Sequence, residues 1–300
     1  MADFDDVRGE EKLQIAQHFL LSSPPGQFHE ILSDLKKLLP EGLLTDELTM
    51  GIAHSYNTKT CKVVTAPSGS KTLICAAGEI DTTHYMDPVT GAPFGVDHLT
   101  LVTANVGDDY PCPPKPATNL EQRRVQLQDA LKGYLIEAYP SEESAGTVFI
   151  KDGKLVITLT GEKTNLRNFW SGRITSSWTI ATDGLDLASL SLSDSQKITI
   201  SISGDIKVHA HYFEDGNVQL QTNRQFPAKN VAIANPEKDF AGPVINAIRE
   251  REQALEQGLS DMYVNMNEET FKQMRRLMPI TRQKMEWNIN AIKMVKQLRK

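Results

Sequence analysis

Two histidines, His209 and His211, are the residues whose type and spacing most directly suggest a chemical role, that of metal ligands. They are one residue apart in a stretch that alternates like a β-strand, so both side chains would leave one face of a sheet, as two metal ligands must. Lys207 and Phe213 would share that face, and the sequence identifies no clear third ligand. We therefore expect a structural sheet face here and no metal site.

Other catalytic patterns are missing from the sequence. It contains no GxSxG nucleophile elbow, no P-loop, no GxGxxG and no HExxH. The three cysteines, Cys61, Cys75 and Cys112, are scattered and none lies in a CxxC pair, which is typical of free thiols in a reducing compartment. We expect a protein without enzyme activity and without a cofactor.

The C-terminal end carries a charge opposite to that of the rest of the chain. Between Lys272 and Lys300 there are nine Lys or Arg residues and one acid, Glu286, a net charge of +8, whereas the whole chain of 300 residues carries -6. Fold stability does not require this polarity, which indicates an acidic partner. The acidic body, the pI of about 5.7 and the lack of a basic motif interleaved with aromatic residues argue against nucleic acid.

Pro279 divides this end into two parts. Before it, Lys272 and Arg276 are four residues apart and would project together from a short helix. After it, Thr281 can cap a second helix. That helix has an apolar stripe at helical spacing, formed by Trp287, Ala291, Met294 and Leu298. Three interpretations remain open: a helix docked on the protein's own core, a helix in a groove of an acidic partner, or a helix on an anionic membrane.

The N-terminal half of the chain predicts helices followed by short strands. Residues 10–56 contain three apolar helical stripes separated by proline or glycine, typical of a small antiparallel bundle. Residues 60–100 read as short β-segments, and the four prolines of residues 105–117 read as a stiff connector. A helix over residues 120–138 follows, ended by Pro140.

The second half predicts an antiparallel sheet and a long helix. From Gly146 to about Ala232, about five strands alternate apolar and polar residues, and the Asp152-Gly153 turn is a strong hairpin signal. Residues 182–196 read as a polar loop. Asn235-Pro236-Glu237 has the form of a helix start, although the helix can also begin just before Pro243. Its single apolar stripe predicts that it covers one face of the sheet.

These elements predict an α+β fold with one body, residues 1–266, and a C-terminal extension, residues 267–300. The body would consist of a helical bundle over 1–58, a small β region and linker over 59–116, a helix and five-stranded antiparallel sheet over 117–234, and a long helix over 235–266. The N-terminus lacks the pattern of a secretory signal and no apolar run is long enough to span a membrane, so we expect a cytosolic or nuclear protein.

Several segments together resemble a known family, the alpha subunit of F-actin capping protein. They are Asn168–Arg173, reading NFWSGR, with Trp178; Val208–Leu220, reading VHAHYFEDGNVQL; and Thr270–Trp287, reading TFKQMRRLMPITRQKMEW. The resemblance runs in order along the whole chain. It is strongest over residues 165–225 and 270–287.

The resemblance implies a heterodimer with a beta subunit of similar fold, in which the two sheets join. It implies binding to the barbed end of an actin filament in the cytoplasm, a block of subunit addition and loss, and a response to phosphoinositides. The matching basic positions of the tail are Lys272, Arg276 and Arg282, to which the apolar stripe adds Trp287 and Leu298. The residues leave open whether the chain can also pair with itself.

Overall fold

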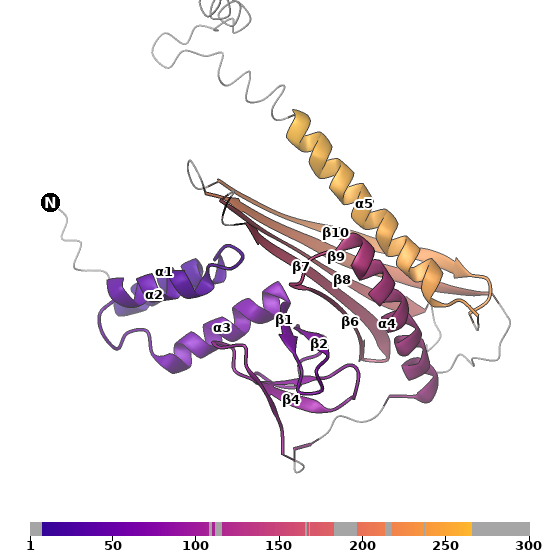
Figure 1. Cartoon of the computed structure of the whole chain (residues 1–300), viewed down its shortest axis with the longest axis horizontal. Helices are drawn as coiled ribbons and strands as arrows, with labels where there is room; N and C mark the ends of the chain where they lie inside the picture. The colour runs from indigo at the N-terminus through magenta and orange to yellow at the C-terminus, as the bar shows by residue number, and fades with distance from the viewer. Residues whose placement is uncertain are drawn as a thin grey trace, which may run out of the picture. The chain divides into compact units, whose positions relative to one another are not determined.

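The computed structural model describes residues 8–107, 110–111, 116–165, 167, 169–182, 197–213, 218–236 and 238–265. The chain divides into two compact units, Met1–Asn246 and Ala247–Lys300, which are described separately. The described part is a mixture of helices and antiparallel sheets, which confirms the predicted fold class (Figure 1).

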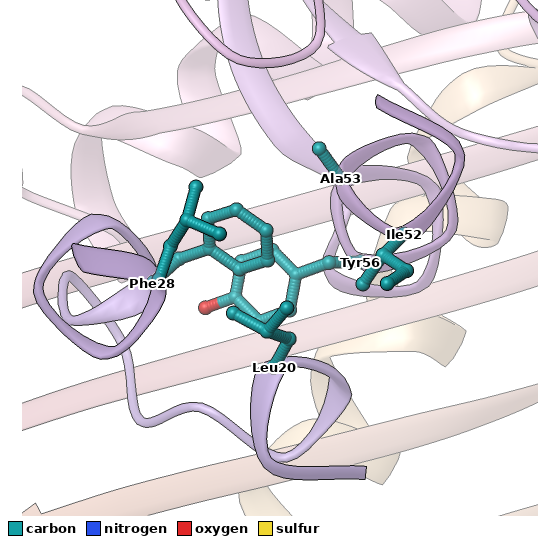
Figure 2. Close-up of a cluster of buried hydrophobic side chains, with 6 residues drawn as sticks. Leu20, Phe28, Ile52, Ala53 and Tyr56 are labelled. Atoms are coloured by element: carbon teal, nitrogen blue, oxygen red, sulfur yellow. The ribbon is translucent and has the colours of Figure 1, made fainter. Parts of the chain in front are cut away.

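Three helices open the first unit, as predicted: α1 (Gly9–Leu21), α2 (Phe28–Leu38) and α3 (Asp46–Thr60). They share an apolar core of Leu20, Phe28, Leu32, Ile52, Ala53 and Tyr56. Figure 2 shows this cluster. The rings of Phe28 and Tyr56 lie 4.8 Å apart. Thr45 caps α3, since its hydroxyl accepts a hydrogen bond of 3.3 Å from the Leu48 amide. The apolar spacing read from the sequence therefore corresponds to a real bundle core.

Two small sheets follow the bundle. One is a hairpin of β1 (Lys62–Thr65) and β2 (Lys71–Ile74); the other has three strands, β3 (His84–Met86), β4 (Pro93–Val96) and β5 (Thr103–Asn105). Because side chains alternate along a strand, the hairpin packs on both of its faces. Val64 and Ile74 join the cluster of the three-stranded sheet, whereas Leu73 joins a cluster with Phe149 of the large sheet.

The large sheet is a five-stranded antiparallel meander, as predicted. Its strands, in the spatial order β10-β9-β8-β7-β6, are β6 (Ser144–Lys151), β7 (Lys154–Asn165), β8 (Trp170–Thr182), β9 (Ile198–Tyr212) and β10 (Val218–Ile233). The predicted Asp152-Gly153 turn joins β6 and β7, and both residues have positive φ, 51° and 71°. Residues 183–196 of the predicted polar loop lie outside the described residues.

The two outer strands of this sheet have different neighbours. Helix α4 (Thr118–Ala138) lies along β6, where the Gln128 amide donates to the Gly146 carbonyl at 3.0 Å and accepts from the Val148 N–H at 2.9 Å. Gln128 thus satisfies one donor and one acceptor on the free edge of β6. Within the described ranges, β10 has a strand neighbour on one side alone.

Helix α5 (Ala241–Asn265) begins later than the Asn235-Pro236 pattern indicates. Asn235 does accept a backbone hydrogen bond, from Lys238 at 3.3 Å, but it belongs to a turn that precedes the helix. The Asp239 carboxylate accepts from the Gly242 N–H at 2.8 Å and takes the capping role. Asn235 as the cap is therefore wrong, and the alternative start just before Pro243 is right. None of the helices in the described ranges has the length and apolar content of a membrane span.

Candidate functional site

The predicted contact residues of the C-terminal extension lie outside the described residues. These are Lys272, Arg276, Arg282, Trp287 and Leu298. Their part in binding stays a prediction. The described chain offers two other features with functional potential: the polar face of the large sheet and the open edge at β10.

His209 and His211 lie on one face of β9, as the alternation predicts, but each ring has amide partners. The Nε2 atom of His209 lies 3.3 and 3.2 Å from the side-chain amides of Gln219 and Gln221 on β10. His211 is 6% exposed, and its Nδ1 atom lies 3.2 Å from the Gln27 amide nitrogen. Among the described residues no three His, Cys, Asp or Glu side chains gather as a metal site would need. The pair is part of a structured polar face.

A buried charged network on the same polar face joins two regions that are distant in sequence, α3 with β1 and β7 with β8. The Glu162 carboxylate on β7 is 6% exposed and accepts two hydrogen bonds from the Lys62 ammonium, at 2.8 and 2.7 Å. Nη1 of Arg173 on β8 lies 3.3 Å from Glu162 and donates to the Tyr56 hydroxyl at 3.3 Å. The Arg173 guanidinium also stacks over the Tyr56 ring at 5.5 Å. We call these four residues the charged network; it links α3 and β1 to the sheet.

The charged network was not predicted from the sequence. Glu162 and Arg173 are cross-strand partners in the register of β7 and β8, and Tyr56 is 117 residues before Arg173. The sequence does indicate that Arg173 lies on the polar face, because it falls on the polar side of an alternating strand. In the register of β8 and β9 it is the direct neighbour of His209. The partners of such a charge are set by tertiary packing, so the pattern alone cannot name them.

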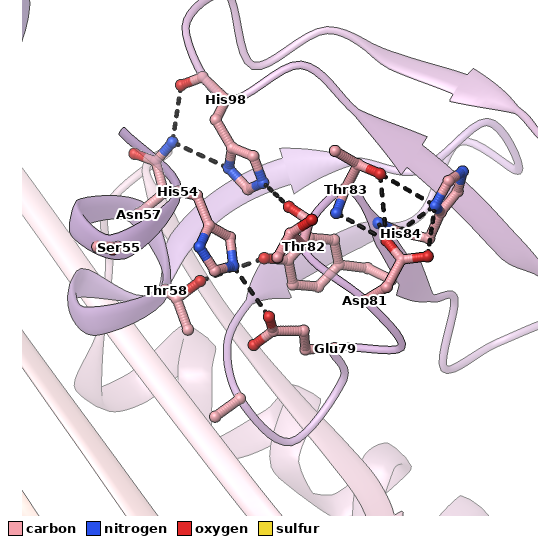
Figure 3. A network of polar contacts seen from close by, with 12 residues as sticks. His54, Ser55, Asn57, Thr58, Glu79, Asp81, Thr82, Thr83, His84 and His98 are labelled. Atoms are coloured by element: carbon pink, nitrogen blue, oxygen red, sulfur yellow. Dashed lines mark hydrogen bonds and ion pairs between the residues drawn. The ribbon is translucent and has the colours of Figure 1, made fainter. Parts of the chain in front are cut away.

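A second polar cluster fills the loops beside the three-stranded sheet (Figure 3). Nε2 of His54 lies 2.9 Å from Glu79, and Nε2 of His98 lies 2.9 Å from the Thr82 carbonyl oxygen. Burial is the main reason that the pKa of His98 falls below its ordinary value. These groups hold α3 against the loops, and each functional atom named here has a structural partner.

Asp81 organises the neighbouring turn. Its carboxylate accepts hydrogen bonds from the Tyr110 hydroxyl at 2.5 Å, from the Thr83 amide at 2.8 Å and from the His84 amide at 2.9 Å. Burial by itself raises the pKa of Asp81, but these hydrogen bonds outweigh it and hold the pKa well below the usual range. The same bond to Asp81 raises the pKa of Tyr110 to about 12. Asp81 is therefore a turn-forming carboxylate that stays ionised.

The two described cysteines are poor nucleophiles. Burial, as the largest cause, raises the pKa of Cys61 to about 12 and also raises the pKa of the Cys75 thiol. A thiol must lose its proton to attack a substrate, so neither is activated near neutral pH. Cys112 lies outside the described residues.

In the part of the chain that the structure describes, β9 is the one strand paired with β10, and we call the outer side of β10 the open edge. Val218 and Leu220, near the start of this strand, are 64% and 39% exposed. A register shift between Phe226 and Lys229 interrupts the pairing with β9, and Pro227 falls in it, as expected for an edge strand. The nine residues from Val218 to Phe226 remain a regular strand that is exposed except at the half-buried Thr222 and Phe226, and such an edge can pair with a strand of another chain.

Comparisons with known proteins bear on what this arrangement does. A family model described as F-actin capping protein alpha subunit matches residues 16–297. An F-actin-capping protein subunit alpha from Dictyostelium discoideum is 31% identical, over 97% of this chain and 99% of its own. One from Caenorhabditis elegans is 30% identical, over 94% of this chain and 95% of its own.

A solved structure shares the fold. It is described as a homodimeric actin capping protein alpha subunit from Plasmodium berghei, with a TM-score of 0.68 at 24% identity. The match covers 91% of this chain and 98% of that chain.

Proposed function

Because this chain belongs to the family of F-actin capping protein alpha subunits, we propose that it is a subunit of an actin capping protein. It binds the barbed end of an actin filament and blocks the addition and loss of subunits there. It does so by binding, without catalysis or a cofactor, in the cytoplasm on the actin cytoskeleton. The observation that carries this proposal is the family match over residues 16–297.

Seeded actin elongation tests the proposal directly. The full-length protein, purified with a beta subunit, should stop growth from filament seeds at concentrations far below that of the actin monomer. Seeds whose barbed ends are already blocked should grow at an unchanged rate, which separates capping from monomer sequestration. Unchanged growth from free barbed ends, with the beta subunit present, would refute the assignment.

We assign the main actin contact to residues 267–300, as an extension of the body formed by residues 1–266. Its support is the net charge of +8 between Lys272 and Lys300, which suits the acidic surface of a partner. Lys272, Arg276 and Arg282 would contribute charge contacts. Trp287 and Leu298 would contribute apolar contacts from one stripe of the last helix.

A second candidate function uses the same extension. Clustered cations beside an amphipathic stripe also bind anionic lipid, so the protein can be a peripheral phosphoinositide-binding protein. The sequence feature that favours it is the same cationic segment, Lys272 to Lys300. The two functions are compatible, and substitutions in the extension separate them.

The open edge of β10 supports the assembly with a beta subunit. We propose that a strand of the partner pairs with Val218–Phe226 and continues the sheet. The opposite edge is already served by Gln128 of α4, which bonds to two main-chain groups of β6. A second copy of this chain is the alternative partner, because the solved Plasmodium berghei relative is described as homodimeric.

A charge placed on this edge should weaken assembly. We expect Leu220→Lys to weaken the association of the subunits about 30-fold, because a lysine on an edge strand opposes strand pairing. Analytical ultracentrifugation across a concentration series measures this shift. The matched control is Ile136→Lys on α4, which is also exposed, at 80%. Equal association constants for the two variants would exclude β10 as the assembly edge.

A further inference from the structure

A cavity of about 240 Å³ lies between the ends of α1 and α3 and the polar face of the sheet. Its basic lining residues are Lys59 at the end of α3, Arg173 on β8, and Lys207 and His209 on β9. We call it the cationic cavity. Its other lining residues are hydroxyl, amide or apolar, and no carboxylate is among them. From this lining we propose that the cationic cavity binds a small phosphate-class anion.

Positive charge around the cationic cavity exceeds negative charge. The nearby carboxylates are Glu162, which Lys62 and Arg173 share, and Asp205, which pairs with Lys207 at 3.4 Å. Lys59 has no ion-pair partner among the described residues. There are thus two carboxylates for four permanent cations, which are Lys59, Lys62, Arg173 and Lys207. A bound anion would compensate the excess positive charge.

Arg173 gives this site a buried anchor. It is 7% exposed, and its bonds to Tyr56 and Glu162 both leave from Nη1. A guanidinium has five N–H donors in a rigid fork, so donors on its other nitrogens stay available to the cavity. Such a preorganised fork suits the paired oxygens of a phosphate. The charged network therefore serves as the support that fixes Arg173 in place.

His209 reports the potential inside the cationic cavity. Burial is the largest influence and lowers its pKa, and the charges of Arg173 and Lys59 lower it further. The cations that would attract an anion therefore add to the effect of burial in disfavouring the charged form of the ring. An anion bound beside the ring would stabilise the imidazolium and raise its pKa.

The size and lining of the cavity limit the ligand. A volume of about 240 Å³ is below the range of about 300–1,000 Å³ that is usual for drug-sized ligands. Thr175 offers a hydroxyl group and Asn223 an amide, and both can donate to the oxygens of an oxyanion. The Ser22 and Ser23 hydroxyls already donate to main-chain carbonyls of α1. The volume and the lining suit inorganic phosphate or pyrophosphate.

Titration with pyrophosphate tests the proposal on the full-length protein, purified with the subunit it assembles with. The readout is the imidazole proton resonance of His209 in an NMR spectrum. A His209→Gln variant assigns this resonance, which reports an anion bound beside the ring. We expect a saturable shift and an increase in the pKa of His209. Lys59→Gln should weaken binding about tenfold, because it removes one charge contact without disturbing an ion pair.

Two controls make the result decisive. Lys132→Gln removes an exposed lysine that pairs with Asp129 at 2.9 Å on α4, and it should leave the titration unchanged. Vesicles that contain phosphatidylinositol bisphosphate should not shift His209, since the proposed ligand is a free anion and not a lipid headgroup. The proposal is overturned if pyrophosphate does not shift the His209 resonance, or if Lys59→Gln and Lys132→Gln bind pyrophosphate with equal affinity. It is also overturned if the lipid vesicles shift the resonance and pyrophosphate does not, because the site would then bind a membrane.

Discussion

Removal of residues 270–300 should weaken barbed-end capping by on the order of 100-fold, because it deletes nine basic residues and the apolar stripe of the predicted last helix. Seeded elongation over a range of capping protein concentrations measures the apparent affinity. The body should stay folded and assembled, since the deleted segment follows α5, which ends at Asn265. An unchanged affinity would exclude the extension as the main actin contact.

Point substitutions separate the charge from the helix. The triple variant Lys272→Ala, Arg276→Ala, Arg282→Ala should lose about tenfold in affinity, and the loss should shrink as salt screens the wild-type contacts. Its melting temperature should barely change, because solvated surface residues rarely alter stability by more than about 0.5 kcal/mol. A collapse of the melting temperature would instead indicate a helix docked on the protein's own core.

A matched control tests whether position or mere charge matters. Lys36→Ala, Lys37→Ala, Lys132→Ala removes three exposed lysines of the body and should leave capping unchanged. Phosphoinositide vesicles offered to both triple variants address the second candidate function. If the tail variant loses vesicle binding but keeps full capping affinity, the extension is a membrane anchor and its assignment to actin is wrong.

Glu162→Gln should destabilise the fold by about 3 kcal/mol, because removal of one partner of a buried ion pair leaves the other charge uncompensated. The charge left behind is that of Arg173, which is 7% exposed, together with the Lys62 ammonium, which loses bonds of 2.8 and 2.7 Å. Urea unfolding of the assembled protein, followed by circular dichroism, measures the change in the free energy of unfolding. The glutamine keeps the shape of the side chain, so the effect isolates the charge.

The control for this prediction is Asp129→Asn. It breaks the exposed pair with Lys132, whose side chain is 64% exposed, and such pairs contribute roughly 0–1 kcal/mol. A double variant, Glu162→Gln with Arg173→Met, should be less destabilised than the sum of the two single variants, since it removes both charges of the Glu162–Arg173 pair. Equal costs for Glu162→Gln and Asp129→Asn would show that the charged network does not hold the bundle to the sheet.

Local signals predicted the large sheet and the bundle well, because their geometry is dictated by near neighbours in sequence. The turn at Asp152-Gly153 has the two positive φ angles that this dipeptide favours, and alternating isoleucines place Ile200, Ile202 and Ile206 in the core. The strands β3 to β5 were not predicted individually. They are three or four residues long, too short for an alternation to repeat.

The start of α5 shows how two local signals compete. Asn235-Pro236 has the composition of a helix start, and Asn235 does accept a backbone hydrogen bond, but in a turn. Asp239 is four residues closer to the stripe and caps the helix instead, through the Gly242 amide. A capping side chain needs only a nearby N–H group, so the pattern cannot tell a turn from the first turn of a helix.

What the sequence determined by itself is the cationic segment from Lys272 to Lys300, with its apolar stripe, because net charge and periodicity belong to the chain before it folds. The tertiary structure decided which charges become buried partners. Tyr56, Glu162 and Arg173 meet because α3 packs on the register of β7 and β8, and the same packing leaves Lys59 beside a cavity with spare donors. Contacts over such separations arise from the summed packing of many side chains, which no local pattern encodes.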